Sequence, residues 1–452
     1  MRNENPDRDM RPIGIDLFAG AGGLSLGFEQ AGFDVAAAVE IDPVHCAVHK
    51  FNFPNTAVIP RSVEGLSAAA IRIAAGIGDR EVDCVFGGAP CQGFSLIGHR
   101  VLDDPRNKLV RDFVRIVAEL KARTFVFENV KGLTVGHHRT FLKELIRAFD
   151  AAGYEVRQPW RVLNAGHYGT PQHRERLILF GARKGEPLPD YPAPLTNIPG
   201  KRQRIGDLPD GPSCAEAIGD LPDADRFRTL LASDAVATTA FGKPSAYAAR
   251  LRCMINDAWD YGYVREWKPG ILTSSARTEH TEISRLRFSG TKQGEVEPIS
   301  RFFKLHGDGV SNTLRAGTDG ARGAFTSPRP IHYRYDRCIT VREMARLHGF
   351  PDWFRFNVTK WHGARQIGNA VPPPLARVIA GEVMKVFGIE PTRPEGAIPL
   401  GNPALLSLDL TGAAAHFGVE APPSRRDKKS GAKKRKQADI ERERLGREAV
   451  YG

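Results

Sequence analysis

A cysteine and a glutamate stand at the ends of two strand-like segments of this sequence. Cys91 follows the apolar run 82–86, and Glu128 follows the apolar run 124–127. In an open α/β sheet, ligands bind in the crevice outside the carboxyl ends of the strands. A thiolate there could act as a nucleophile and a carboxyl group as a proton donor. Each residue alone is weak support, because a lone cysteine is more often a buried thiol and a lone glutamate often faces solvent.

Two arginines precede the last strand-like segment of the same region. Arg174 and Arg176 lie two residues apart, so on a strand their side chains project to the same face. Guanidinium groups placed there could hold a base carbonyl, the thiolate region or a phosphate. For one arginine pair taken by itself, an exposed strand face is the simpler interpretation.

A glycine-rich turn, residues 18–27, follows the first apolar run and leads into a helix. Glycines let the backbone approach a ligand closely, or they serve only a tight structural turn. Glu40 ends the second apolar run twenty residues after Gly20, a spacing at which a carboxylate can bind ribose hydroxyls. Ser25 replaces the third glycine of the pyrophosphate-binding fingerprint, which favours S-adenosylmethionine over a nicotinamide cofactor. The further residues that favour this cofactor are Phe18, Gly22 and Gly23.

Apolar runs and helical periodicity alternate through the first 180 residues. Such alternation predicts a doubly wound, mostly parallel α/β sheet of the Rossmann-like kind. The predicted strands are 13–18, 35–39, 82–86 and 124–127, with two closing strands at 157–163 and 176–180. The predicted helices are 109–120 and 141–149.

The alternation then stops and returns only near the end of the chain. Residues 185–330 are rich in proline, glycine, arginine and scattered aromatics, and we expect a second, smaller and irregular domain there. A helix should begin after Thr340 in a capping box and end at Gly349, and another should follow Pro372. The predicted division is 11–184 for the first part of a discontinuous catalytic domain, 185–330 for the second domain, 331–390 for the return with a closing helix, and 391–452 for a disordered basic tail.

Composition and charge indicate which partners and which cellular compartment suit this protein. The 452 residues carry a net charge of +12, half of it within 424–452, and clustered Lys and Arg suit a polyanionic partner. No apolar stretch approaches the roughly 20 residues that cross a bilayer, and the first dozen residues hold no secretory signal, so we expect a cytoplasmic protein. The six cysteines and the histidines show no metal-ligand spacing, so no metal is expected.

Six sequence blocks, arranged in the family's order, resemble those of the DNA (cytosine-5)-methyltransferases of bacterial restriction–modification systems. Together they cover residues 13–181 and about 337–386. The blocks are the glycine turn, residues 90–92 (Pro-Cys-Gln), 127–130 (Phe-Glu-Asn-Val), 172–176 (Gln-His-Arg-Glu-Arg), 342–351 and 366–373.

The resemblance implies how these side chains would work together. Carbon 5 of cytosine is a poor nucleophile, so Cys91 would add to carbon 6 as a thiolate and make carbon 5 reactive toward the methyl donor, S-adenosylmethionine. Glu128 would donate a proton at N3, Arg176 would stand nearest the chemistry, and Arg174 would support it. The residues implied for cofactor binding are Phe18, Gly20, Gly22, Gly23, Glu40, Ile41, Pro90, Asn369 and Val371.

Double-stranded DNA is the partner that the resemblance implies. The target cytosine would leave the base stack, residues 92–107 would close over it as a lid, and residues 185–330 would read base edges in the major groove. One departure concerns the adenine of the cofactor. The family usually has Asp-Ile where this chain reads Ser62-Val63-Glu64, so the acidic contact to the adenine amino group is in doubt, and Glu64 is the available substitute.

Two other functions are compatible with parts of this pattern. A transfer-RNA cytosine-5 methyltransferase has similar catalytic blocks, but the long insert after residue 181 favours DNA recognition. A catalytically silent DNA-binding protein would keep the fold, but in this sequence every catalytic position of the six blocks holds the residue type that the family has there. The resemblance also suggests a cognate restriction endonuclease, and we expect a monomer associated with the nucleoid. The recognised DNA sequence is not readable from these residues.

Overall fold

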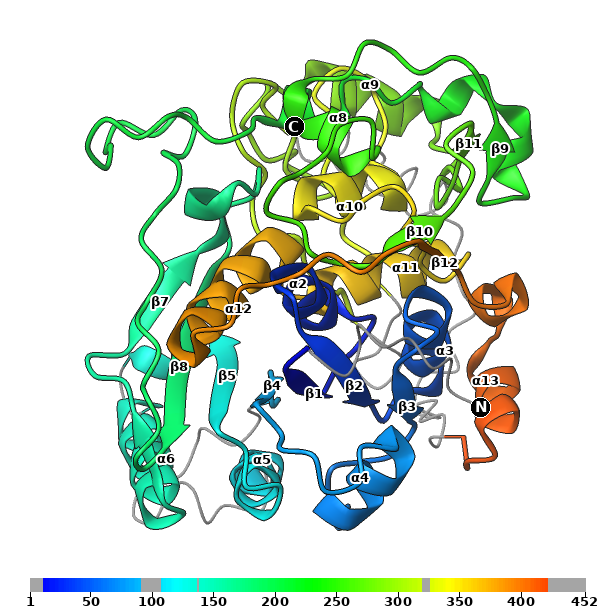
Figure 1. The fold of residues 1–452 in the computed structure, drawn as a ribbon. Coiled ribbons are helices and arrows are strands. Elements are labelled where there is room, and N and C mark those ends of the chain that lie inside the picture. The colour runs from blue at the N-terminus through cyan, green and yellow to red at the C-terminus, as the bar shows by residue number, and fades with distance from the viewer. Residues whose placement is uncertain (1–10, 91–106, 136–137, 319–325, 422–452) are drawn as a thin grey trace, which may run out of the picture.

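An eight-stranded sheet forms the centre of the lower part of the molecule (Figure 1). The structure is a computed structural model that describes residues 11–90, 107–135, 138–318 and 326–421. The strand order is β3-β2-β1-β4-β5-β8-β6, with β7 also paired to β8. The strands are β1 (Ile13–Leu17), β2 (Asp34–Val39), β3 (Ala57–Ile59), β4 (Cys84–Gly87), β5 (Thr124–Val130), β6 (Tyr154–Val156), β7 (Arg161–Asn164) and β8 (Glu175–Arg183). Strands β1 to β5 pair in parallel, and the predicted fold class is confirmed.

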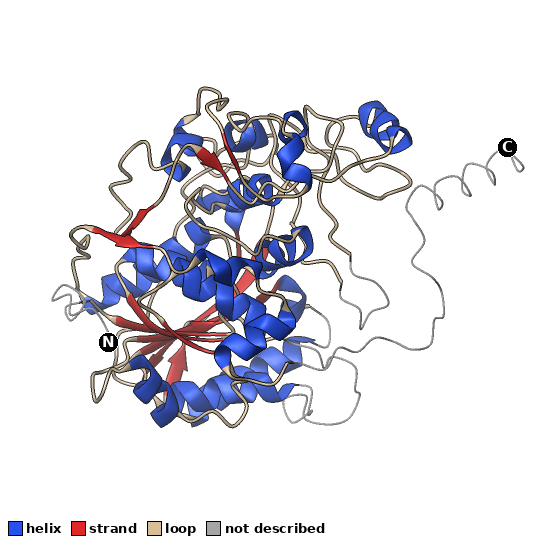
Figure 2. Cartoon of the chain, turned by 90° about the vertical axis from the view of Figure 1, so that its right-hand side faces the viewer, coloured by secondary structure: helices blue, strands red, loops and turns tan. Residues whose placement is uncertain are grey.

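Helices cover both faces of this sheet, so the domain has three layers (Figure 2). Side chains alternate across a strand, and on β5 Phe125 and Phe127 enter one apolar cluster while Val126 enters the other. The helices of the first cluster are α4 (Ala68–Ala75), α5 (Lys108–Glu119) and α6 (His138–Ala151). The helices of the second are α2 (Gly23–Ala31) and α12 (Pro373–Phe387). Strands buried on both faces account for the continuous apolar runs in the sequence.

The sheet closes with three strands where the sequence predicted two. The predicted strand 157–163 begins only at Arg161, and a separate strand, β6, ends at Val156, just before the predicted range. Pro159 lies between the two, and a proline lacks the amide donor that a strand ladder needs. β8 runs antiparallel to β5, β6 and β7, and its first residues therefore lie beside the end of β5.

Most of the described residues between 185 and 330 form the upper part of the molecule, which is irregular, as expected (Figure 1). The elements there are short: α7 (Cys214–Ile218), α8 (Ala246–Leu251), α9 (Glu282–Gly290), β9 (Val236–Ala237), β10 (Val264–Glu266) and β11 (Ile271–Leu272). Of these, α7, α8, β9 and β11 share an apolar core with α10 (Val341–His348) and α11 (Lys360–Asn369), whereas Phe288 of α9 lies in a separate small cluster. The capping box that Thr340 makes with Glu343, and the helix end at Gly349, are both confirmed. The domain boundaries stay predictions.

Part of the predicted disordered tail is ordered. Residues 397–417 hold β12 (Ala397–Pro399), a 3-10 helix (Pro403–Ser407) and α13 (Leu410–Phe417). Leu405 and Leu406 are buried against Val48 and Phe51 of α3 (Pro43–Asn52), and β12 pairs in parallel with β10. Burial of these leucines supplies the apolar contacts that a disordered segment lacks. The basic stretch 422–452 lies outside the described residues.

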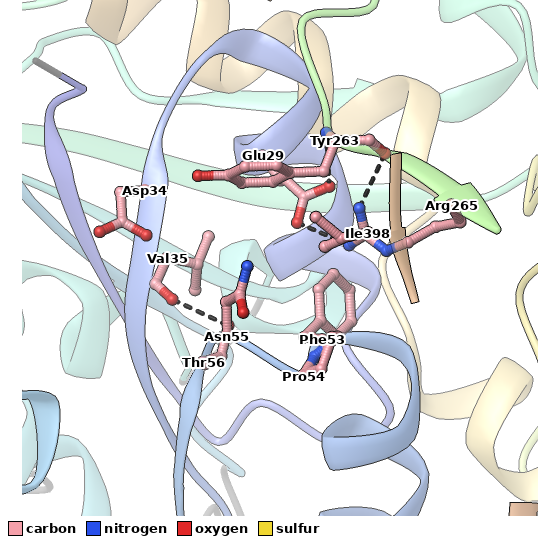
Figure 3. A pocket seen from close by; sticks show the side chains of 10 residues that line it. All are labelled: Glu29, Asp34, Val35, Phe53, Pro54, Asn55, Thr56, Tyr263, Arg265 and Ile398. Atoms are coloured by element: carbon pink, nitrogen blue, oxygen red, sulfur yellow. Dashed lines mark hydrogen bonds and ion pairs between the residues drawn. The ribbon is translucent and has the colours of Figure 1, made fainter. Parts of the chain in front are cut away.

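Arg265 fastens the upper part to the sheet domain. Its buried guanidinium donates to the Glu29 carboxylate at 2.8 Å and to the Asn52 carbonyl at 3.2 Å. Figure 3 shows this junction around a small pocket, where Ile398 of β12 also lies. Removing one member of a buried ion pair leaves the other charge uncompensated, so this contact holds α2 and β10 together. Within the described residues, no helix is long and apolar enough to cross a membrane.

Candidate active site

Glu128 and Arg176 face each other at the carboxyl end of β5. The Glu128 Oε1 and Arg176 Nε atoms are 2.7 Å apart, and the two side chains are 12% and 13% exposed. Glu128 is opposite Ile178 in the antiparallel register, so Arg176, two residues away on β8, is its diagonal neighbour on the same face. The structure therefore brings together two of the four side chains predicted to be catalytic.

The chain that leads to Cys91 passes directly beside Glu128. β4 and β5 are parallel neighbours, and a Cβ atom at Gly88 would lie 2.5 Å from Glu128 Oε2. The Asn129 side chain donates from Nδ2 to the Ala89 carbonyl at 2.9 Å, which fixes the chain two residues before the cysteine. Cys91 and the predicted lid up to residue 106 lie outside the described residues.

Arg174 points into the protein interior. Its guanidinium is buried and donates to three backbone carbonyls, those of Leu314 at 3.0 Å, Gly368 at 2.8 Å and Ala370 at 2.8 Å. These carbonyls come from segments far apart in the sequence. Arg174 thus joins chain segments, a role that fits the supporting position expected for it better than contact with a substrate.

The glycine turn takes a left-handed course over the end of β1. Phe18 has φ 63° and Gly20 has φ 55°, and nothing lies within 4 Å of where a Gly20 Cβ would be. The Glu40 carboxylate accepts from the Gly20 amide at 2.8 Å and from the Asp42 amide at 2.9 Å. Each carboxylate oxygen has a second lone pair, so Glu40 can brace the turn and still accept from a ligand hydroxyl. Ile41, beside it, is 61% exposed.

The junction of α11 and α12 closes this turn from the far end of the chain. A Cβ at Gly23 would lie 2.4 Å from the Val371 carbonyl oxygen, so only glycine permits this approach. Gly22 has φ 102° and packs on Phe53, so packing also explains that glycine. Asn369 is exposed and Val371 is buried. Of the predicted cofactor residues, Phe18, Gly20, Glu40, Ile41 and the exposed Pro90 therefore follow the carboxyl ends of β1, β2 and β4, and Val371 lies against Gly23 at the start of α2.

Comparison with known proteins decides the family. The model of the C-5 cytosine-specific DNA methylase family matches residues 13–385. This chain belongs to that family. Its reaction is methylation of carbon 5 of cytosine in DNA, which confirms the predicted family and activity. Neither a transfer-RNA enzyme nor a silent DNA-binding protein is the function that these matches support.

Individual relatives cover most of the methylase. Type II methyltransferase M.XorII of Xanthomonas oryzae pv. oryzae is 57% identical over 91% of this chain and 93% of its own length. Type II methyltransferase M1.HphI of Haemophilus parahaemolyticus is 32% identical over 82% of this chain and 86% of its own. A prophage-encoded E. coli protein, assigned as a DNA modification methyltransferase, is 31% identical with a TM-score of 0.67 and covers 84% of this chain and 100% of its own.

The methylase also holds a buried hydrogen-bond network of three side chains beneath the glycine turn. Sequence reasoning missed this network. Ser25 Oγ lies 2.6 Å from Asp16 Oδ2 and 3.0 Å from His49 Nε2, and all three side chains are buried. Burial raises the pKa of Asp16 to about 8 and lowers the pKa of His49 to about 3. The available signal was an aspartate inside a strand predicted to be buried, since such a group needs hydrogen-bond partners. The hydrogen bonds of this network connect β1, α2 and α3 under the turn.

Replacing Asp16 by asparagine is expected to flatten the pH dependence of the methylase's stability. Because burial raises the Asp16 pKa from 3.8 to about 8, the folded protein keeps a proton between these pH values that the unfolded chain releases. The resulting stabilisation is complete below about pH 4 and is lost as pH rises toward 8, at up to ~1.4 kcal/mol per pH unit. Urea unfolding between pH 5.5 and 8 should show a shallower decline of the unfolding free energy for Asp16→Asn. Equal slopes would contradict a protonated Asp16.

The residues at the adenine-contact position lie near the start of α5. Val63 is buried, whereas Glu64 is exposed and forms an ion pair with Lys108. The Glu64 side chain is thus not packed in the apolar core. Its contact with the adenine of the cofactor stays a prediction. Among the described residues, no three His, Cys, Asp or Glu side chains gather where they could bind a metal ion.

Proposed function

We propose that the methylase acts on one cytosine within a specific duplex sequence, as the modification enzyme of a type II restriction–modification system. Relatives named type II methyltransferases support this, with M.XorII 57% identical over 91% of the chain. In this proposal a cognate endonuclease cuts the same sequence when it is unmethylated. We also propose a monomer that is located in the cytoplasm and associates with the nucleoid through DNA.

S-adenosylmethionine is the proposed cofactor, and the residues present suit it. The space beside Gly20, the carboxylate of Glu40 and the exposed side chain of Ile41 lie together at the ends of β1 and β2. Glu40 would accept from the ribose hydroxyls, as acidic residues at this spacing do. The bound cofactor supplies an electrophilic methyl group. Phe18, Pro90 and the segment around Ala370 would complete the walls of the site.

Three side chains carry the proposed chemistry. The Cys91 thiolate forms a bond to cytosine carbon 6 while Glu128 donates its proton at N3, so that no negative charge accumulates on the ring. Carbon 5 would then take the methyl group as its bond to the donor's sulfur breaks. The proton on carbon 5 would leave to a base, the bond from carbon 6 to the Cys91 sulfur would break to release the thiolate, and the proton at N3 would return to Glu128. Arg176, 2.7 Å from Glu128, would hold that carboxyl group and the base. The closeness of this pair to the chain leading to Cys91 is the observation that carries the proposal.

DNA recognition is assigned to the irregular upper part. A base inside a duplex cannot reach the end of β5, so the target cytosine must flip out. In the proposal, residues 185–330 read the sequence and residues 92–107 close over the flipped base. The catalytic domain would then comprise 11–184 and 331–390.

Methyl transfer from labelled S-adenosylmethionine tests this function directly. We expect label in duplex DNA and none in transfer RNA, and base-resolution mapping of DNA from an expression host should show 5-methylcytosine at one short sequence. Label in transfer RNA alone would contradict DNA as the acceptor. Methylation scattered over all cytosines would contradict sequence-specific modification.

A further inference from the structure

Two side chains bond one backbone carbonyl, that of Ala370, and a third side chain holds one of the two. Arg174 Nη2 lies 2.8 Å from this oxygen and His348 Nε2 lies 3.0 Å from it. Gln172 completes the group, since its Nε2 lies 2.9 Å from His348 Nδ1. We call Gln172, Arg174 and His348 the Ala370 hub. All three side chains are buried.

The hydrogen bonds assign the protonation of His348. The Gln172 amide nitrogen can only donate, so His348 Nδ1 must accept and the ring proton sits on Nε2. His348 Nε2 therefore donates to the Ala370 carbonyl. Burial, with Arg174 nearby, lowers the pKa of His348 well below its ordinary value, which keeps the ring neutral. The Ala370 carbonyl thus receives two donors with defined geometry.

The hub also binds the segment that lies in the predicted recognition domain. Gln172 Oε1 accepts from the Leu314 amide at 3.1 Å, and Arg174 donates to the Leu314 carbonyl at 3.0 Å. The same segment touches α11, because a Cβ at Gly368 would lie 2.3 Å from the Ala316 nitrogen. Leu314 and Ala370 are therefore held by the same side chains.

On its other side, Ala370 lies between two residues proposed to contact the cofactor, Asn369 and Val371. The Val371 carbonyl and the Ala370 Cβ lie against Gly23 of the glycine turn. A shift of Leu314 would thus reach the glycine turn through the Ala370 carbonyl, which Arg174 also binds, and through the close contact of Val371 with Gly23. Packed interiors transmit such shifts because they have little free volume.

We propose that the Ala370 hub is a positioning device that links DNA binding by the recognition segment to cofactor binding at the glycine turn. DNA that holds Leu314 in place would, through Arg174 and His348, hold Asn369 and Val371 against the turn. The proposal rests on the cofactor site and the recognition domain proposed above. Linkage is reciprocal, so bound cofactor would tighten DNA binding by the same factor.

Calorimetric titration with S-adenosylhomocysteine, the unreactive product, tests the link. For the unaltered protein we expect a duplex carrying the mapped target to tighten binding at least about fivefold, the lower end of usual couplings. Arg174→Lys should bring this factor close to one, because a single ammonium cannot serve three carbonyls in a fixed fork. Arg342→Lys is the matched control. Arg342 is equally buried and donates to the carbonyls of Thr273, Pro351 and Phe354, none of which is a residue of the glycine turn or bonded to the Ala370 hub in the described structure.

A second pair of variants decides the matter if Arg174→Lys does not fold. His348→Gln offers an amide donor and acceptor in place of the ring nitrogens and should keep the factor, whereas His348→Leu should lose it. An unchanged factor in Arg174→Lys or His348→Leu, or an equal loss in Arg342→Lys, would overturn the hub. If the unaltered protein transfers no label to DNA, the proposed function fails instead. Transfer of label without any effect of DNA on product binding would overturn the hub alone.

Discussion

Cys91→Ala is expected to abolish methyl transfer while DNA and cofactor binding persist. Without the thiolate, no bond forms at cytosine carbon 6 and carbon 5 stays unreactive toward the methyl group. Loss of a catalytic nucleophile lowers kcat by roughly four orders of magnitude or more. Single-turnover transfer of labelled methyl groups to duplex DNA measures the rate, and gel-shift titration measures the binding that should remain.

Cys253→Ala provides the matched control for this experiment. Cys253 is an exposed free thiol in the upper part of the molecule, so its loss removes a cysteine without touching the proposed site. Its rate should stay within about twofold of the unaltered enzyme, as expected for a surface substitution. A Cys91→Ala enzyme that retained a tenth of the normal rate would assign the nucleophile to another residue.

Glu128→Gln is expected to lower kcat by about 10²- to 10⁴-fold, the usual contribution of a positioned general acid. Glutamine has almost the same shape and can accept a hydrogen bond from Arg176, but it has no proton to release at N3. The KM for DNA should change much less than kcat, because the lost interaction is made mainly in the transition state. Steady-state kinetics with a saturating methyl donor separates the two constants.

Glu186→Gln tests whether loss of any ion pair on β8 has this effect. Glu186 pairs with Arg183 at 2.9 Å and with Arg123 at 3.2 Å, near the opposite end of the same strand. Such ion pairs near the surface contribute about 0–1 kcal/mol to stability, and this one does not include a residue of the proposed site, so kcat should stay near that of the unaltered enzyme. Equal losses in the two variants would mean that Glu128 acts only by holding the strand.

Local patterns were enough to place the central strands and several helix ends. The strands predicted from the apolar runs 82–86 and 124–127, and the capping box at Thr340, depend on residues close in the sequence, and these predictions are confirmed. The ordered segment 397–417 was missed because it is held by contacts with α3, about 350 residues earlier in the chain, and by pairing with β10. The buried hydrogen-bond network of Asp16, Ser25 and His49 was missed for the same reason, since it joins three elements that only packing brings together.

The two arginines separate what the sequence determined from what the tertiary structure decided. Residue types and spacing indicated a thiol, a carboxyl group, two guanidinium groups and a glycine turn at the ends of predicted strands, because local periodicity indicates where strands lie along the chain. Spacing alone left Arg174 and Arg176 equivalent, and only the family resemblance ranked Arg176 nearer the chemistry. Only the fold decided that Arg176 meets Glu128 while Arg174 donates to the carbonyls of Leu314, Gly368 and Ala370. Those three carbonyls lie about 140 to 200 residues away, and no local pattern specifies a contact across that distance.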